Sequence, residues 1–227
     1  GGHFGFSPAG TVPGSASIAI EIDPTFVEYH LIDLDPSRAE ALRRLQANRP
    51  NVFVYQGDCN RVLQEKVIPK VQYAQDRRGL CLLDPYGLHL SWKVIEAAGK
   101  SNAIDLFLNF PIMDMNRNVL CKNREAVELS QAARMTFFWG DESWRDVAWD
   151  TKRDLFGHPE KVENEVIAAA FQDRLRKAAG FKYVPDPMPM RNSTGTAVYY
   201  LFFAAQKRPA NNIVTDIFKK YRDWGKR

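Results

Sequence analysis

The sharpest chemical signal in the sequence is Asp84-Pro85-Tyr86-Gly87, which follows the apolar run Leu80–Leu83. Where a buried strand ends in this way, its last carboxylate stands at the edge of the sheet where ligands bind in α/β folds. Asp84 could accept a hydrogen bond from an exocyclic amine while the amine nitrogen attacks a methyl group. Pro85 would stiffen the turn, and Tyr86 offers a ring on which a base could stack. A strand-ending Asx turn with a surface tyrosine is the alternative interpretation.

Two acidic residues end an earlier apolar run, Leu31-Ile32-Asp33-Leu34-Asp35-Pro36. At the lip of a strand, the Asp33 carboxylate could accept both hydroxyl protons of a cofactor ribose. Asp35 directly precedes a proline at a predicted helix start, so we expect it to cap that helix.

A Gly-Asp turn follows the next predicted strand, in Gly57-Asp58-Cys59-Asn60. At the same edge of the sheet, Asp58 or its neighbour Cys59 could lie near the adenine amino group of a cofactor. Such turns are common in proteins, and Cys59 is equally explained as a small residue that fills space.

Amides and guanidinium groups come after the later strands. Asn109 and Arg117 could line a substrate cleft, or they could satisfy the backbone of an irregular loop; both interpretations stay open. Arg191 precedes a predicted hairpin turn and could reach a phosphate. The 4 histidines have no metal-binding spacing and the 3 cysteines form no CxxC pair, so we predict neither a metal site nor a disulfide framework.

Apolar strands and helices alternate along the first half of the chain. The acids that end successive strands, Asp33, Asp58 and Asp84, are 25 and 26 residues apart, which is about one βα unit. This alternation predicts a mostly parallel sheet. Its strands are expected at Glu28–Leu34, Val52–Gln56, Leu80–Leu83 and Ala103–Phe110.

The second half of the chain follows a different pattern. Helices and loops are expected as an insertion from about 114 to 160, followed by a helix that ends at Gly180. Phe181–Met190 and Ala197–Ala205 then predict an antiparallel hairpin. Parallel units finished by such a hairpin favour a class I methyltransferase-like Rossmann fold over a plain dinucleotide-binding fold. The last helix is expected from about 212 to 224, with an apolar stripe of Ile213, Ile217, Tyr221 and Trp224.

Aromatic residues crowd part of the insertion. Three of them are consecutive in the sequence and would point in different directions from one helix, so some are expected at an interface. A lid whose aromatic side chains are all buried is the alternative. The residues are Phe137, Phe138, Trp139, Trp144 and Trp149.

Composition sets wider bounds on fold and partners. The 227 residues suit a single domain over 1–227, and 31 basic against 27 acidic residues give a net charge of +4, which permits contact with nucleic acid without implying it. No window is long and apolar enough for a transmembrane helix, and we see no leader. We therefore expect a soluble, cytoplasmic protein without membrane contact.

Several runs resemble the three-Cys-motif partner proteins (TcmP), over about Pro13 to Tyr221. The resemblance implies a methyltransferase-like fold, S-adenosylmethionine as cofactor, and a partner protein with a three-cysteine motif, which is related to phage proteins. The matching runs are YHLIDLD at 29–35, GDCN at 57–60, LLDPYG at 82–87, LNFPIMDMNRN at 108–118, PMRN at 189–192 and YYLFFA at 199–204.

The turn at 84–87 also resembles the DPFG and DPPY motifs of methyltransferases that act on exocyclic amines of nucleic-acid bases. That likeness implies that Asp84 orients the amine and Tyr86 stacks on the base, although Gly87 departs from DPPY. Family members also carry a first strand and a glycine-rich loop, roughly DxFAGxG, ahead of the segment that matches Pro13-Gly14-Ser15. That strand is apparently missing here, and we expect a fragment rather than a member unable to bind the cofactor.

Two functions follow as expectations. The first is S-adenosylmethionine-dependent methyl transfer to an exocyclic amine of a DNA or RNA base. The alternative is a non-catalytic adaptor that binds the three-cysteine partner protein.

Overall fold

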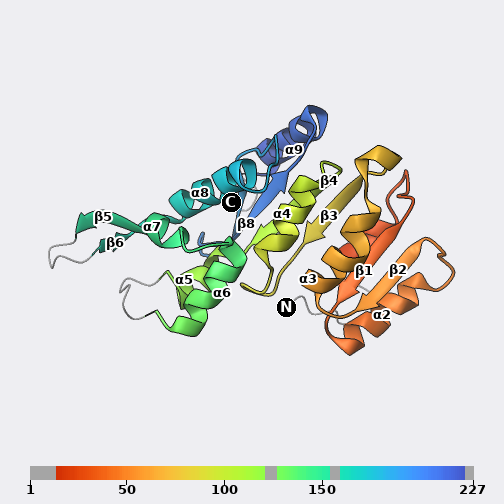
Figure 1. Ribbon diagram of the computed structural model, residues 1–227, viewed down its shortest axis with the longest axis horizontal. Helices are drawn as coiled ribbons and strands as arrows, with labels where there is room; N and C mark the ends of the chain where they lie inside the picture. The colour runs from red at the N-terminus through yellow and green to blue at the C-terminus, as the bar shows by residue number, and fades with distance from the viewer. Residues whose placement is uncertain (1–13, 121–126, 154–158, 223–227) are drawn as a thin grey trace. The chain divides into compact units, whose positions relative to one another are not determined.

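The computed structural model describes residues 14–120, 127–153 and 159–222 and shows an α/β chain (Figure 1). The chain divides into two compact units, which we call the first unit (1–69) and the second unit (70–227). Each has its own sheet and its own hydrophobic cluster, so each is described by itself. A single methyltransferase-like domain over 1–227 stays a prediction.

The first unit is built around two parallel strands that pair from Tyr29↔Val52 to Asp33↔Gln56. Asp35 caps the helix between them, because its carboxylate accepts hydrogen bonds from two backbone N–H groups of the first helical turn, as predicted. The elements are α1 (Ser15–Ile20), β1 (Tyr29–Asp33), α2 (Pro36–Gln46), β2 (Val52–Gln56), α3 (Cys59–Val62) and the π-helix η1 (Leu63–Val67).

Two 3-10 turns, η2 (Ile68–Lys70) and η3 (Tyr73–Gln75), lead to the main sheet of the second unit, whose strand order is β3-β4-β8-β7. Its elements are β3 (Gly79–Leu83), α4 (Trp92–Lys100), β4 (Ile104–Phe110), α5 (Ile112–Asn118), α6 (Leu129–Trp139), α7 (Trp144–Ala148), β5 (Trp149–Arg153), β6 (Pro159–Lys161), α8 (Asn164–Lys177), β7 (Met188–Arg191), β8 (Ala197–Ala204) and α9 (Arg208–Tyr221).

The mostly parallel sheet expected from the sequence is not what the described residues form. Only β1–β2 and β3–β4 are parallel pairs, whereas β8 pairs antiparallel with both β4 and β7. The hairpin reverses the chain between β7 and β8, and β8 then pairs with β4 in the antiparallel direction as well. The antiparallel hairpin itself was predicted and is confirmed.

The core of the second unit packs against both faces of β4. Alternate β4 residues are buried, and Phe110 packs 4.7 Å from Phe171 of α8, measured between ring centroids. Phe171 also contacts Trp92 at the start of α4. On the other face, Phe107 lies 6.4 Å from Phe218 of α9. Helices therefore cover both faces of β4.

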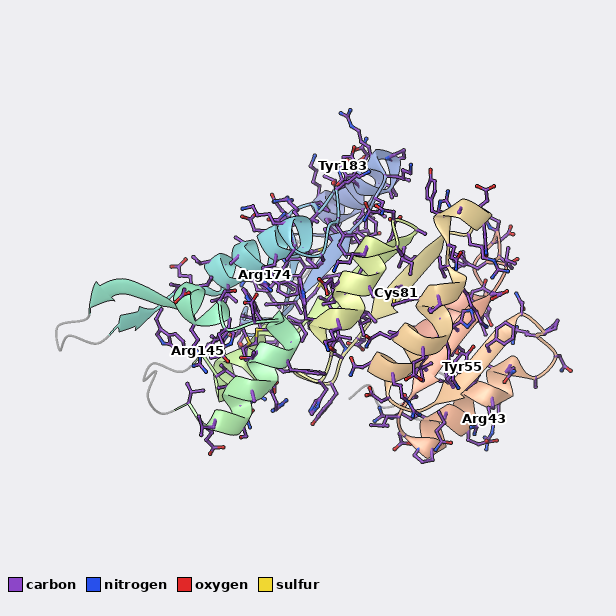
Figure 2. The ribbon with its side chains drawn as sticks, viewed as in Figure 1. Arg43, Tyr55, Cys81, Arg145, Arg174 and Tyr183 are labelled. Atoms are coloured by element: carbon purple, nitrogen blue, oxygen red, sulfur yellow. The ribbon has the colours of Figure 1, made fainter. Side chains whose placement is uncertain are left out.

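The insertion is helical in α5, α6 and α7, as expected, but it ends in the antiparallel pair β5–β6, which was not predicted. The interface expected here is wrong for its tryptophans, because Trp139, Trp144 and Trp149 are 1%, 1% and 5% exposed. Arg174 of α8, which is labelled in Figure 2, lies 5.6 Å from the centroid of the Trp139 ring, and Trp139 also packs against Phe171 of the same helix. Only Phe137 of the five aromatic residues is largely exposed.

The last helix packs through a different face from the one predicted. Val214 and Phe218 of α9 are buried, whereas Ile213, Ile217 and Tyr221 are 62%, 46% and 42% exposed. Trp224, which we placed on the same stripe, lies outside the described residues. None of the helices in the described ranges combines the length and the apolar character needed to cross a bilayer.

Candidate functional site

The parallel pairing of β3 and β4 brings two polar side chains together where the strands end. Leu83 pairs with Leu108, so Asp84 and Asn109 follow at the same level of the sheet. The Asn109 side-chain amide donates a hydrogen bond from Nδ2 to Asp84 Oδ1 at 2.6 Å. Because Asp84 is exposed, its carboxylate can also meet a ligand from solvent.

Asn109 has a second polar atom whose bonding is unsatisfied. Its Oδ1 is buried and has no hydrogen-bond partner among the described residues. A buried acceptor without a donor costs about 1–3 kcal/mol. Because this oxygen is closed to solvent, the end of the β3–β4 pair offers a ligand one exposed acceptor, the Asp84 carboxylate, which the Asn109 amide orients.

Tyr86 presents an aromatic ring at the same turn. The side chain is 79% exposed, and its ring stacks on His89 with 6.3 Å between centroids and an interplanar angle of 20°. A planar aromatic ligand could stack on the Tyr86 ring in the same way. Pro85, which joins Asp84 to Tyr86, is half-buried.

The backbone of this turn and its close packing require glycine at position 87. Its φ is +57°, and a Cβ at this position would lie only 2.7 Å from Asp114 Oδ2 of α5. Arg134 of α6 donates from Nη2 to that same oxygen at 3.4 Å and lies 3.5 Å from His89 Nε2. The turn is thus held against α5 and α6 by residues that sequence reasoning missed, and the glycine was its only sequence signal.

The two arginines proposed for substrate binding lie in different places. Arg117 is exposed in the last turn of α5. Arg191 is on β7, where it donates to the Gly195 carbonyl at 2.9 Å and lines a cavity of about 390 Å³. The other amides of the 109–118 run have structural partners, since Asn116 bonds Asn164 and Asn118 bonds Asp114.

The cavity lies between α8 and the β7–β8 hairpin. In its wall, the Tyr200 hydroxyl donates to Glu165 Oε1 at 3.0 Å. Burial and the neighbouring Glu165 carboxylate raise the pKa of the Tyr200 phenol, which therefore stays protonated at neutral pH. The side chains that line the cavity belong to Glu165, Ala168, Ala169, Gln172, Asp186, Pro187, Pro189, Arg191, Tyr200 and Arg222.

In the first unit, the two acids proposed for cofactor binding lie at one end of the β1–β2 pair. The Gly57 N–H donates to the Asp33 carbonyl at 3.0 Å, which places Asp58 next to the end of β1. Asp33 Oδ1 accepts from the Asp35 N–H at 2.8 Å, and Asp58 Oδ1 accepts from the Asn60 N–H at 2.9 Å. Asp58 is therefore the cap of α3 as well as a candidate ligand.

Cys59 is placed as a packing residue rather than a reactive thiol. Burial, and next the Asp58 charge, raise the pKa of the Cys59 thiol, so the nucleophilic thiolate is disfavoured at neutral pH. Across the described part of the chain, no group of three or more His, Cys, Asp or Glu side chains is placed to hold a metal ion. Two of the histidines and Cys121 fall outside the described residues.

Comparisons with protein-family models, with curated proteins and with solved structures found no match to this chain.

Proposed function

We propose that this protein is an S-adenosylmethionine-dependent methyltransferase that acts on an exocyclic amine of a nucleic-acid base. The observation that carries the proposal is the exposed Asp84 carboxylate, held by the Asn109 amide, with the exposed Tyr86 ring beside it. A carboxylate can accept an N–H of a primary amine, and the amine is attached to a planar ring that tyrosine can stack on.

In this proposal, the Asp84 carboxylate stabilises the charge that develops during the reaction. A carboxylate that accepts an amine N–H favours the positive charge that develops on nitrogen as the new N–C bond forms. The proton that leaves the nitrogen can pass to the Asp84 carboxylate or to solvent. Asn109 holds Asp84 Oδ1 through its own amide and so keeps the carboxylate oriented.

The residues of the first unit fit the adenosine part of the cofactor. Asp33 engages the backbone through Oδ1, and its Oδ2 has no partner among the described residues, so it can accept ribose hydroxyl protons. Asp58 would lie near the adenine amino group, and the neutral Cys59 would contribute apolar surface. S-adenosylmethionine would supply an electrophilic methyl group.

Transfer of radiolabelled methyl groups to bulk DNA, bulk RNA and free nucleosides tests the enzymatic proposal. We expect the label in one of these substrates with the natural protein and its loss, by at least about tenfold, in Asp84→Asn. Asp216→Asn is the matched control, because this exposed α9 carboxylate carries the same charge change elsewhere. Equal transfer by both variants would overturn the role of Asp84.

Cofactor binding can be measured separately by calorimetry with S-adenosylmethionine and S-adenosylhomocysteine. Loss of the charged ribose acceptor in Asp33→Ala should weaken binding by about 1.5–3 kcal/mol. The matched control is Asp76→Ala, since Asp76 is exposed in the second unit. Unchanged affinity in Asp33→Ala would contradict the assignment of this residue.

A second candidate function is that of a non-catalytic adaptor for a three-cysteine partner protein. It is favoured by exposed apolar side chains in the second unit, namely Leu80 and Leu82 of β3 and Ile213 of α9. Co-purification of the two proteins would be unaffected by Asp84→Asn if the chain is an adaptor only. Methyl transfer that depends on Asp84 would exclude that reading.

A further inference from the structure

A positively charged cluster surrounds Tyr73 at the amino end of β3, away from Asp84, which follows the carboxyl end of that strand. Tyr73 is 46% exposed. Lys207, which precedes α9, donates from Nζ to the Tyr73 hydroxyl at 3.3 Å, and the Arg78 guanidinium lies 3.7 Å from the ring centroid. Two cations from distant parts of the sequence thus contact the same tyrosine side chain, one at its hydroxyl and the other at its ring.

Both cations are held in place, Arg78 through its side chain and Lys207 through the residue that precedes it. Arg78 donates from Nη1 to the carbonyls of Tyr73 and Arg77, at 3.4 and 2.8 Å. Lys207 follows Gln206, whose buried side chain donates to the Gly99 and Gly180 carbonyls. The positions from which the charges extend are therefore fixed by the fold.

More positive charge surrounds this pair than negative charge. Arg77 and Arg208 adjoin the two cations in sequence, and Lys182 is brought close by the pairing of Tyr183 with Ala205, which precedes Gln206. Two carboxylates face the cluster. Asp76 lies 4.0 Å from Arg78, and Asp105 accepts from the Gln206 N–H at 3.1 Å.

Two of these groups have shifted pKa values, for different reasons. The hydrogen bond from Lys207, followed by its charge and that of Arg78, lowers the pKa of Tyr73. Burial raises the pKa of the Asp105 carboxyl.

From this convergence of fixed cations around an exposed aromatic ring, we propose that the surface formed by Tyr73, Arg77, Arg78, Lys182, Lys207 and Arg208 binds the phosphate backbone of single-stranded nucleic acid. Neighbouring cations repel one another, and a row of phosphates relieves that repulsion while releasing counterions. An exposed tyrosine adds a face on which an unpaired base can stack. The cations lie on an open surface, which suits an extended polyanion better than a small anion.

The proposal goes beyond methyl transfer and does not depend on it. Binding of a fluorescein-labelled 20-nucleotide single-stranded DNA, followed by anisotropy between 50 and 300 mM NaCl without any methyl donor, tests it. Since each phosphate contact on a single strand contributes about 0.7 to the slope of log K against log salt, Arg78→Gln/Lys207→Gln should lower the slope by about 1.4. Tyr73→Leu should weaken binding about tenfold.

The matched control is Lys219→Gln/Lys220→Gln, which removes two exposed charges that lie about 18 Å or more beyond Lys207 along α9. It should leave the slope near that of the natural protein. Thermal melting of each variant checks that it folds, and an Arg78→Lys/Lys207→Arg variant, which keeps both charges, should retain the slope. Equal slopes for the two double glutamine variants, no binding at 50 mM NaCl, or tighter binding of poly-glutamate than of DNA would each overturn the proposal.

Discussion

The side chains of Asn109 and Asp84 are joined across two neighbouring parallel strands, with 2.6 Å between Asn109 Nδ2 and Asp84 Oδ1. This hydrogen bond links the turn after β3 to β4, so a substitution of either residue should change the orientation and charge environment of the other.

Asn109→Asp should make the free energy of unfolding depend on pH. Two adjacent carboxylates repel, so one of them acquires a raised pKa, and each unit of that shift costs about 1.4 kcal/mol. The cost is absent below the unfolded carboxyl pKa of about 3.9 and grows as pH rises through the raised value. Urea unfolding at pH 3.5 and pH 7.5 should show a loss of stability at the higher pH alone. Asn212→Asp, on the exposed side of α9, should show no such difference.

Gly87→Ala should destabilise the protein for two separable reasons. The positive φ costs about 1 kcal/mol for any residue with a Cβ, and the 2.7 Å approach of that Cβ to Asp114 adds a steric cost. Gly195→Ala shares the positive φ but has no atom within 4 Å of the added Cβ, so it isolates the first cost. Chemical unfolding should therefore rank Gly87→Ala as the more damaging change, and equal losses would contradict the steric argument.

Arg174→Met should lower the free energy of unfolding by about 2–4 kcal/mol. The guanidinium donates to the Trp139 carbonyl, to Ser143 Oγ and to Asp141, and it lies 4.8 Å from the Trp92 ring, so no apolar side chain can replace its contacts. Lys177→Met on the same helix is the comparison, since that side chain is 77% exposed. Guanidinium chloride unfolding would distinguish the two; similar midpoints would refute the role given to Arg174.

The hydrogen bond from Tyr200 to Glu165 should be visible in alkaline titration. Because the pKa of this phenol is raised by burial and by the Glu165 charge, its stabilising effect is complete below the unfolded value of about 10 and is lost as pH rises above it. Tyr200→Phe should therefore remove a late-ionising tyrosine from the absorbance titration at 295 nm. Tyr199→Phe, its neighbour on β8, should leave that late step in place.

Much of the local structure could be read from the sequence because local chemistry decides it. The apolar run Val52–Gln56 is β2, and Asp35 before Pro36 caps α2. The hairpin also follows from its turn residues. In each case the signal and the structure it produces lie within a few residues of each other.

Other features could not be predicted because distant contacts decide them. The stripe Ile213, Ile217 and Tyr221 has helical spacing, yet Phe107 and Phe203 select the neighbouring Phe218 face of α9 for burial. Trp139 of the insertion likewise packs on Phe171 of α8. At the candidate site, Asp84 and Tyr86 could be recognised from the sequence as candidate site residues. The contacts of Asp114 and Arg134 with the 84–87 turn could not, because they depend on how α5 and α6 pack against it.

The two sheets differ in when they can be completed during synthesis. Tyr29 pairs with Val52, so β1 and β2 can meet soon after both have left the ribosome. Phe110 pairs with Tyr200, so β4 gains its antiparallel neighbour only after a further 90 residues have been synthesised. Loop closure over such a separation is slow, and until β8 arrives the edge of β4 that faces away from β3 has no strand beside it. We therefore expect this open edge to be the part of the second unit most prone to aggregation during synthesis.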